Sequence, residues 1–347
     1  MRILITHELF PPDMHGGGER VVYELAKHLR DRGAEVEVAT TGDPRVTEYE
    51  GIPTHRLHVN RYLMNFASSW IKKYAKDADI IQTNNYNACY ASWKAAKSLN
   101  KPVICLVHGM YGKRWLKMRG PIFGYLSYVI EKFQIKRDYD KIIFLSKYAR
   151  DQAVDLGVPM KITEVIKPGI PRGLDSYKIG KKEPFVLFVG RLAKQKGLDN
   201  LIEAAKCLPG IRFLIAGEGE EERRLRSIAP PNVEFLGFVS EKKVTELYSR
   251  ALVFCLPSIG EGFGLVLIEA MASGCAIVST VPLDFEGKHV PINDSESLMK
   301  AIKELMETPA KTKELGKKNA NLAKEYSWDG FLDRYDEICK ELLRRKN

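Results

Sequence analysis

Short apolar runs alternate with longer segments of mixed polarity along the whole chain. In the first half these runs are too short for helices and rich in β-branched residues, which is typical of buried strands. They occupy residues 2–6 (RILIT), 36–40 (VEVAT), 79–83 (DIIQT), 102–107 (PVICLV) and 141–146 (KIIFLS). Between the first two runs, residues 21–29 carry apolar positions at helical spacing, and Gly33 follows as a stop. This alternation predicts βαβ units in a parallel sheet.

The second half repeats the pattern. Its apolar runs occupy residues 185–189 (FVLFV), 211–216 (IRFLIA), 232–239 (NVEFLGFV), 251–257 (ALVFCLP) and 275–280 (CAIVST). The stretch 161–184 that separates the halves is rich in proline, glycine and charge, and it predicts a linker. We therefore predict an α/β protein of two Rossmann-like, doubly wound parallel-sheet domains, at residues 1–169 and 170–326.

The chain is organised around residues 258–274 (SIGEGFGLVLIEAMASG), which lie between two predicted strands. This order predicts a strand, a tight loop that holds Glu261, a helix that holds Glu269, and a second strand. The loop then lies at the carboxyl end of a parallel strand, where open α/β sheets bind their ligands. Gly262 and Gly264 allow the backbone to approach a ligand, and the helix start offers N–H groups to an anion. The pattern predicts a phosphate-containing ligand.

Two carboxylates in one stretch also raise the alternative of a glycosidase acid and nucleophile. If one helix held both Glu261 and Glu269, about 1.5 Å of rise per residue would place them roughly 12 Å apart. Hydrolytic pairs are roughly 5–9.5 Å apart, so the spacing argues against this alternative. A purely structural interpretation, in which both glutamates are ordinary residues of a helix surface or first turn, is also compatible with these residues.

Polar residues and glycines follow four further predicted strands. They are Gly16, Gly17 and Gly18; His108; Arg191 and Lys196; and Gly217 and Glu218. Glycines in a strand-to-helix turn cradle anions, but three glycines can equally form a surface loop. A lone histidine is more often structural than catalytic, and basic loop residues are often only solvated. Each of these groups therefore has a functional and a structural interpretation.

Composition limits the classes of function. The length of 347 residues suits two domains, and 45% hydrophobic residues suffice for their cores. The six cysteines show no C-x-x-C spacing, so we expect reduced core residues in a cytoplasmic protein and no zinc site. The chain starts directly in a strand, so no secretion signal or membrane span is expected. Two D-x-D triplets, 77–79 and 138–140, precede their strands and are interpreted as solvated turns, not as a metal site.

The net charge of +10 is concentrated in the first half, where residues 1–169 carry 26 Lys and Arg against 18 Asp and Glu. No nucleic-acid module is recognisable, so a phosphorylated acceptor or an anionic membrane surface ranks above nucleic acid as a partner. Residues 113–137 carry seven basic residues and one acid, Glu131, among several aromatic residues. This composition suits peripheral docking on the inner face of a membrane. The alternative is a core-facing helix, because Ile122, Leu126, Val129 and Phe133 share one face.

The pattern E-x7-E, here Glu261-GFGLVLI-Glu269 followed by GCAIVST, resembles the motif of retaining glycosyltransferases of family 4, group 1. That resemblance implies the GT-B fold, in which two Rossmann-like domains face a cleft. It implies that Glu269 holds the donor ribose, that Glu261 and adjacent amides lie near the donor sugar, and that Arg191 and Lys196 hold the diphosphate. It also implies that His108, in VHG, contacts the sugar near the reacting carbon. The remaining residues implied to bind substrate are Gly16, Gly17, Gly18, Gly217, Glu218, Phe238, Val239, Gly262, Phe263, Gly264 and Leu265.

The sequence departs from the family in two places. The family usually has I-P-N-G where this chain has Ile166, Lys167, Pro168 and Gly169, so any contact of the asparagine is lost. After Thr280 the usual G-G-x-x-E loop is missing, which puts the rim of the donor site in doubt. The terminal segment, residues 327–347, has helical apolar spacing, and the resemblance implies that it packs back on the first domain.

Together these observations predict a retaining, metal-independent hexosyltransferase without a cofactor. Its donor would be a UDP-, GDP- or ADP-linked sugar, and its acceptor a glycan, a lipid-linked sugar or a small molecule of cell-envelope or glycolipid synthesis. The alternatives are a nucleotide-sugar epimerase or hydrolase of the same fold, and a catalytically inactive GT-B subunit that only binds.

Overall fold

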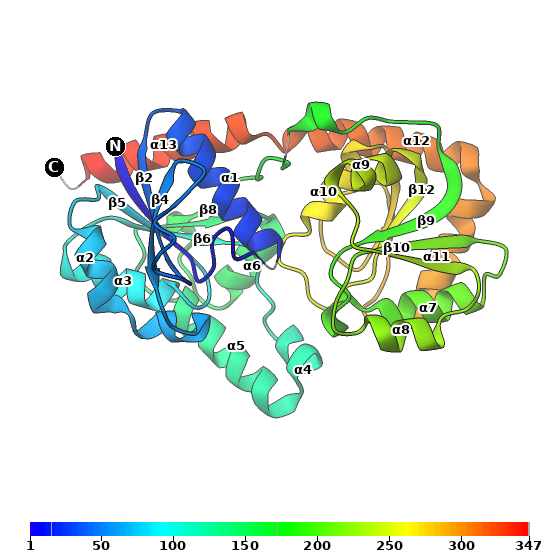
Figure 1. Ribbon diagram of the computed structural model, residues 1–347, viewed down its shortest axis with the longest axis horizontal. Coiled ribbons are helices and arrows are strands. Elements are labelled where there is room, and N and C mark those ends of the chain that lie inside the picture. The colour runs from blue at the N-terminus through cyan, green and yellow to red at the C-terminus, as the bar shows by residue number, and fades with distance from the viewer. Residues whose placement is uncertain (15, 172, 346–347) are drawn as a thin grey trace. The chain divides into compact units, whose positions relative to one another are not determined.

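The computed structural model describes residues 1–14, 16–171 and 173–345, and these form two compact units (Figure 1). Unit 1 contains Met1–Gly112, Tyr125–Pro171 and Trp328–Asn347, and unit 2 contains Lys113–Gly124 and Arg172–Ser327. Each unit has its own sheet with helices on both faces. The prediction of two doubly wound parallel-sheet domains is confirmed.

The sheet of unit 1 has the strand order β3-β4-β2-β1-β5-β6-β7-β8. Its strands are β1 (Arg2–Thr6), β2 (Glu35–Thr41), β3 (Glu48–Tyr49), β4 (Ile52–Leu57), β5 (Ile80–Asn84), β6 (Val103–Val107), β7 (Lys141–Phe144) and β8 (Thr163–Val165). All neighbours are parallel except β3 and β4. The inner strands β5 and β6 are buried along their whole length because helices cover both faces, and β6 is apolar throughout.

The helices of unit 1 connect these strands. They are α1 (Gly17–Asp31), α2 (Ser68–Ala75), α3 (Cys89–Ser98), α5 (Pro121–Ile135, whose first four residues belong to unit 2), α6 (Lys147–Asp155) and α13 (Trp328–Arg344), with 3₁₀ helices η1 (Arg61–Phe66) and η2 (Met160–Ile162). The terminal helix α13 contacts α1, where Arg32 bonds Asp329 at 2.9 Å and Asp333 at 2.6 Å. It also buries Trp328 against Gly169.

The sheet of unit 2 has the order β11-β10-β9-β12-β13-β14, and every neighbouring pair is parallel. Its strands are β9 (Glu183–Val189), β10 (Arg212–Ala216), β11 (Val233–Gly237), β12 (Ala251–Leu256), β13 (Ala276–Ser279) and β14 (Gly287–His289). Its helices are α4 (Arg114–Arg119), α7 (Leu198–Lys206), α8 (Glu222–Ile228), α9 (Glu241–Arg250), α10 (Leu265–Ala272), α11 (Ser295–Glu307) and α12 (Pro309–Leu322), with 3₁₀ helices η3 (Leu174–Ser176), η4 (Lys194–Lys196) and η5 (Ala323–Glu325).

The long apolar strands lie where the sequence predicts them, whereas the edge strands β3, β8 and β14 and the neighbour of β3, β4, were missed. β3 has only two residues, and β4 is interrupted by proline, histidine and arginine. β8 lies inside the predicted linker 161–184, whose beginning therefore belongs to the sheet of unit 1. β14 lies in the short segment after Thr280, which is therefore partly strand. Edge strands are short and polar because one side faces solvent, so their sequence signal is weak.

Helix α5 corrects one interpretation of residues 113–137. The residues expected on a core-facing side, Ile122, Leu126, Val129 and Phe133, are exposed by 41–78%. The buried side of this helix carries Glu131 and other residues instead. Helical spacing shows which residues share a face but not which face turns inward.

Candidate active site

In each unit, the strand order places a switch point at the centre of the sheet. In unit 2 it lies between β9 and β12, whose connections leave toward opposite edges. Such a point opens a crevice at the carboxyl ends of the strands. The loop after β9 holds Arg191 and Lys196, and the loop after β12 holds Glu261.

The two loops are bound tightly to each other. The backbone N–H groups of Ile259 and Gly260 donate to the carbonyl of Gln195 at 2.8 and 3.3 Å. A Cβ atom at Gly197 would lie 2.2 Å from the carbonyl oxygen of Pro257, and Gly197 has a φ of +66°. Only glycine therefore fits at this position, and the contact fixes where Lys196 lies.

Lys196 and Glu261 form an ion pair with Nζ 2.6 Å from Oε2, and each side chain is only 15% exposed. The hydroxyl of Ser258 donates to the same carboxylate oxygen at 3.3 Å. Partial burial strengthens such a pair relative to one in water. An ammonium group held at a strand end next to a glycine loop is suited to take up a phosphate oxygen.

The loop after β12 ends at the start of α10. Gly264 is the N-cap residue with a φ of +89°, and no side chain caps the helix. The N–H groups of Leu265 and Val266 can therefore donate to an anion, whereas the N–H of Leu267 already donates to the carbonyl of Gly264 at 2.8 Å. Glu261 precedes this helix, as the sequence analysis expects for the loop. Phe263 is buried and packs against Tyr326, with 6.0 Å between ring centroids. A ligand could therefore contact the backbone of Phe263 but not its side chain.

Glu269 lies inside α10 and is buried except for 9% of its surface. The hydroxyl of Tyr248, which comes from α9, donates to its Oε2 at 3.1 Å. Burial and the neighbouring Glu269 raise the pKa of Tyr248 well above its usual value, so this hydroxyl stays a donor. The carboxylate is thereby oriented and keeps further capacity to accept hydrogen bonds. Leu265, the first residue of α10, is half-buried.

The loops after β9, β10 and β11 are also joined. A Cβ atom at Gly217 would lie 2.0 Å from the carbonyl oxygen of Gly190. The carboxylate of Glu218 accepts the backbone N–H of Phe238 at 3.1 Å. The ring of Phe238 is 79% exposed, and the half-buried Val239 follows it. An exposed aromatic ring at a strand end is suited to stack on a nucleotide base.

Arg191 does not share a carboxylate with Lys196. Its guanidinium bonds Glu220, from the loop after β10, at 3.0 Å, and both side chains are more than half exposed. Sequence reasoning missed Glu220, which lies in a run of glutamates without distinctive spacing. An exposed pair of this kind contributes at most about 1 kcal/mol, so an incoming diphosphate can displace Glu220.

In unit 1 the switch point lies between β1 and β5. His108 follows β6, and its Nε2 lies 2.8 Å from Oδ1 of Asn84, at the end of β5. Asn84 donates through Nδ2 to the carbonyl of Thr6, so its oxygen faces the histidine and Nε2 carries the proton. Burial, and then the nearby His7, lowers the pKa of His108 to about 3. The imidazole is therefore neutral.

The other ring nitrogen of His108, Nδ1, is buried and has no hydrogen-bond partner within the described residues. In the tautomer set by Asn84 it is an acceptor. Gly18 lies over the ring, because a Cβ atom there would be 3.9 Å from Cγ of His108. Gly16 is the N-cap of α1, and Gly17 and Gly18 form its first turn, so the predicted glycine turn is mainly helix. Gly18 and His108, predicted separately, thus meet in one place.

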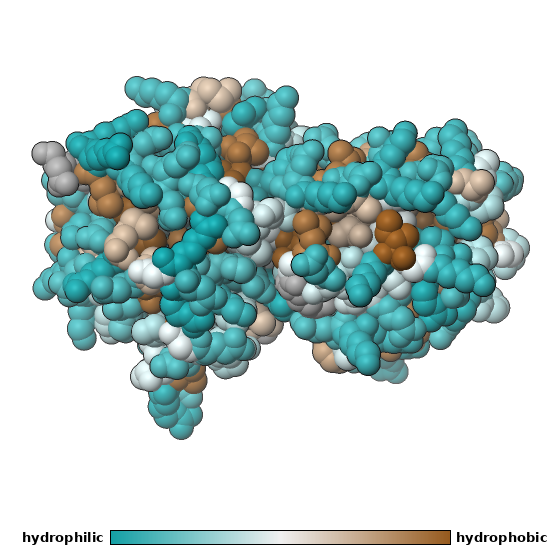
Figure 2. All heavy atoms as spheres, turned by 90° about the horizontal axis from the view of Figure 1, so that it is seen from above, coloured by the Kyte–Doolittle hydropathy of each residue, from teal (hydrophilic) through white to brown (hydrophobic). Residues whose placement is uncertain are grey.

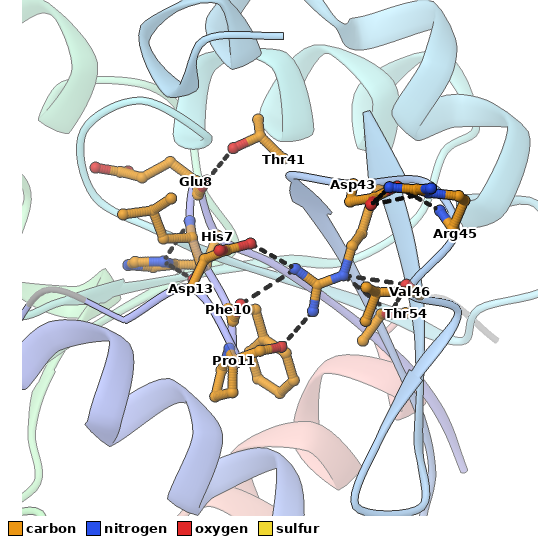
Figure 3. Close-up of polar contacts among 12 residues, drawn as sticks. His7, Glu8, Phe10, Pro11, Asp13, Thr41, Asp43, Arg45, Val46 and Thr54 are labelled. Carbon is orange, nitrogen blue, oxygen red and sulfur yellow. Dashed lines mark hydrogen bonds and ion pairs between the residues drawn. The ribbon is translucent and has the colours of Figure 1, made fainter. Parts of the chain in front are cut away.

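Arg56 supports the loop that precedes these glycines and was not predicted. Its buried guanidinium donates to the backbone carbonyls of Phe10, Pro11 and Val46 and pairs with Asp13 at 3.3 Å. Figure 3 labels these four partners. These contacts fix the path from β1 toward α1. Nothing in the sequence around Arg56 distinguishes it from other strand arginines.

The two D-x-D triplets lie where the sequence analysis expects them, ahead of their strands. Asp79 accepts the backbone N–H of Arg2 at 2.7 Å, directly before β5. Asp140 accepts the backbone N–H of Val103 at 2.9 Å, directly before β7. Both therefore close the amino ends of their strands, away from the switch points.

Within the described ranges, no helix combines the length and the apolar character that crossing a membrane requires. Comparison with known proteins gives two family matches. Residues 15–173 match the model described as Glycosyltransferase Family 4, and residues 174–322 match Glycosyl transferases group 1.

Relatives and solved structures extend over nearly the whole chain. A phosphatidyl-myo-inositol mannosyltransferase of Mycobacterium leprae is 28% identical, covering 91% of this chain and 90% of that protein. Sucrose-phosphate synthase from Thermosynechococcus elongatus has a TM-score of 0.85 at 23% identity, with 99% of each chain covered. Anabaena HepE in complex with UDP-glucose has a TM-score of 0.77 at 21% identity, again with 99% of each chain covered. This chain is a glycosyltransferase of family 4, built from a Family 4 domain and a group 1 domain, and it has the GT-B fold.

Proposed function

We propose that this enzyme transfers a hexose from a nucleoside diphosphate sugar to a hydroxyl group of a lipid-linked or glycan acceptor, with retention of anomeric configuration and without a metal. The observation that carries the proposal is the Lys196–Glu261 pair beside the uncapped start of α10. A cation and free N–H groups at one strand end match a diphosphate. Unit 2 would bind the donor and unit 1 the acceptor.

The donor assignment has two supports. Glu269, oriented by Tyr248, is placed to accept the two hydroxyl groups of a ribose, and Phe238 offers a surface for a base. Solved structures of Anabaena HepE contain UDP and UDP-glucose. A uridine nucleotide is therefore the first donor to test, followed by GDP- and ADP-sugars.

The acceptor assignment rests on a relative. A protein that is 28% identical over 91% of this chain is named phosphatidyl-myo-inositol mannosyltransferase. We propose an acceptor of cell-envelope glycolipid or glycan synthesis that is approached from the cytoplasmic side of the membrane.

In the reaction, the acceptor oxygen forms a bond to the anomeric carbon while the bond from that carbon to the diphosphate oxygen breaks. The acceptor proton leaves with the diphosphate. Arg191 and Lys196 would stabilise the negative charge that develops on the leaving group. Neutral His108 would place no positive charge beside the anomeric carbon, which becomes cationic as its bond to the diphosphate breaks.

The test is incubation of the purified protein with UDP-, GDP- and ADP-sugars, with and without extracted lipids and oligosaccharides as acceptors. Acceptor-dependent release of nucleotide and a glycosylated product are expected, and Glu261→Gln should reduce both. Free sugar without acceptor would indicate a hydrolase, and an altered nucleotide sugar an epimerase. Binding of nucleotide without any turnover across the panel would indicate an inactive subunit.

A further inference from the structure

Helix α5 buries the polar residues Glu131 and Gln134 and exposes most of its apolar residues. The apolar stripe of α5 consists of Ile122, Phe123, Tyr125, Leu126, Val129, Ile130 and Phe133, which are 41–78% exposed. Ordinary surface helices show the opposite arrangement, with the apolar face toward the core. The face seen in Figure 2, by contrast, is largely hydrophilic, and its apolar residues emerge in small separate groups. A contiguous exposed stripe of this kind marks an interaction surface.

The inward face of α5 explains why the helix keeps this orientation. Glu131 is 3% exposed and accepts the backbone N–H groups of Tyr111 at 3.0 Å and Gly112 at 2.7 Å. The hydroxyl of Tyr86 donates to the same carboxylate at 3.3 Å. Turning the helix over would bury the stripe but leave this carboxylate and its donors without partners, which is costly. The outward stripe is therefore part of the folded state.

A second exposed apolar group lies beside the helix. Gln134 of α5 donates to Asn65 of η1 at 3.5 Å, which brings η1 next to the end of the stripe. Within η1, Tyr62 and Leu63 are about half exposed and Phe66 is 80% exposed. The apolar surface thus includes η1 and α5, and in Figure 1 α5 extends away from the sheet of unit 1.

Charge decides what covers this surface. Residues 113–137 contain seven basic residues, and their single acid, Glu131, is buried and already hydrogen-bonded. Exposed lysines at 113, 117 and 136 flank the stripe in the sequence, and the exposed Lys132 lies within it. A second copy of this chain would bring like charges together, whereas an anionic lipid surface complements them. The mixture of aromatic, aliphatic and basic residues is that of interfacial helices.

We propose that α5 docks this protein on an anionic phospholipid membrane, with its apolar stripe inserted among the headgroups and the neighbouring lysines bound to phosphates. The docking itself does not depend on the proposed reaction. It rests on the proposed function only for the step that follows, the presentation of a lipid-linked acceptor to unit 1.

The experiment is co-sedimentation of the full chain with vesicles of phosphatidylglycerol and phosphatidylcholine, and with phosphatidylcholine alone, at low salt and at about 0.15 M salt. The wild-type protein should bind the anionic vesicles, and less tightly as salt rises. Replacement of Lys117, Lys132 and Lys136 by Gln should weaken binding at low salt by about fivefold per lysine. Matched replacement of Lys242, Lys311 and Lys313, which are exposed lysines of α9 and α12, should change little.

The apolar part needs its own variants. Leu126→Ser with Ile130→Ser and Phe133→Ser should reduce binding at least tenfold at both salt concentrations, because insertion is less sensitive to screening than charge. Met160→Ser is the control, since Met160 is as exposed as Leu126 at 54%. The variant residues are exposed, so far-ultraviolet circular dichroism should show intact folding.

Three outcomes would overturn the proposal. They are failure of anionic vesicles to capture the wild type at low salt, equal losses in the control variants, and a stable dimer in sedimentation velocity that the α5 variants abolish. The last result would assign the stripe to a second copy of the chain. Because the vesicle assay contains neither donor nor acceptor, its failure would leave the transfer reaction with soluble acceptors untouched, and failure of transfer would leave docking untouched.

Discussion

Arg191 and Lys196 reach the same edge of the sheet of unit 2, yet each holds a different carboxylate. If both stabilise the leaving diphosphate, either Arg191→Ala or Lys196→Ala should lower kcat by roughly a hundredfold or more. Steady-state kinetics with the identified donor measures this. Arg212→Ala is the matched control. Arg212 is similarly exposed and pairs with Glu234 at 2.9 Å, but it lies at the amino end of β10, whereas Arg191 follows the carboxyl end of β9.

Unchanged turnover in Arg191→Ala would remove this residue from the mechanism. Loss of wild-type activity on addition of a chelator, restored by a divalent cation, would contradict the proposal that side chains alone neutralise the diphosphate.

His108 gives a prediction for pH dependence. In the folded protein its pKa is about 3, below the usual value of 6.5. Between these two pH values the imidazole binds a proton in the unfolded chain but not in the native protein. The wild type should therefore lose stability relative to His108→Gln as pH falls from about 6.5 toward 3, by at most about 1.4 kcal/mol per pH unit. Denaturant unfolding of both proteins across this range measures the difference.

Nitrogen-15 NMR of the histidine ring provides an independent readout. We expect the neutral tautomer with the proton on Nε2, which Asn84 imposes, throughout the neutral range. An ordinary titration near 6.5, or a proton on Nδ1, would contradict this assignment.

At the residue scale, sequence supplied candidates but not their partners. Glu261 and Lys196 are 65 positions apart, and only the tight contact between the two strand-end loops brings them to 2.6 Å. Likewise, Asn84, Tyr248 and Glu220 carry no motif, although each orients or holds a predicted residue. Such pairings depend on strand order, which an apolar run does not specify.

The start of α10 is the element on which the donor proposal depends most. Gly264 has a φ of +89°, and a Cβ atom there would lie 3.3 Å from Leu267 and 3.4 Å from Glu261. Gly264→Ala should cost about 1–2 kcal/mol in unfolding free energy. It should also weaken nucleotide binding at least tenfold, because the first-turn N–H groups shift. Chemical denaturation and titration calorimetry test both effects.

Gly210→Ala is the control for this prediction, because a Cβ atom at Gly210 would meet nothing within 4 Å. We expect its stability to lie within about 0.5 kcal/mol of the wild type, with unchanged nucleotide binding. Normal binding by Gly264→Ala would show that the start of α10 does not hold the diphosphate.

The packing of α13 on unit 1 gives a second prediction at this scale. A Cβ atom at Gly169 would lie 2.2 Å from the ring of Trp328, so Gly169→Ala should destabilise the protein by about 1–3 kcal/mol. Gly330, in the same helix, faces open space, and Gly330→Ala should stabilise it by about 0.5–1 kcal/mol. Thermal unfolding distinguishes the two. Equal effects in the two variants would mean that the Trp328 contact does not limit this position.

Elements differ in how well the sequence predicts them, for physical reasons. Strands buried on both faces are rich in apolar residues, so the apolar runs of β1, β5, β6, β9 and β12 were recognisable. Edge strands such as β8 and β14 are short, and they pair with a neighbouring strand on one side only. The orientation of α5 could not be read from periodicity, because the bonds of Glu131 to a distant loop decide it.

At the scale of the whole molecule, the family match establishes the reaction type but leaves the stereochemistry as a proposal. Retention requires that the acceptor oxygen replace the diphosphate on the same face of the anomeric carbon. The carboxylate of Glu261 already pairs with Lys196 and accepts a hydrogen bond from Ser258. These contacts suit a group that stabilises charge more than a nucleophile that attacks the anomeric carbon. We therefore expect a direct exchange on one face, with the α-anomer of the donor giving an α-linked product.

Proton NMR of the product, recorded before any spontaneous change at the anomeric centre, decides the question through the coupling between the first two sugar protons. The sugar chosen should be glucose or galactose, for which that coupling separates the two anomers. Glu261→Gln should slow the reaction but leave the product anomer unchanged if the carboxylate only stabilises charge. A β-linked product from an α-linked donor would overturn retention. A sugar found covalently attached to Glu261 would indicate a two-step reaction, which also retains configuration, instead of direct exchange. The product anomer and the mass of the trapped protein must therefore be measured together.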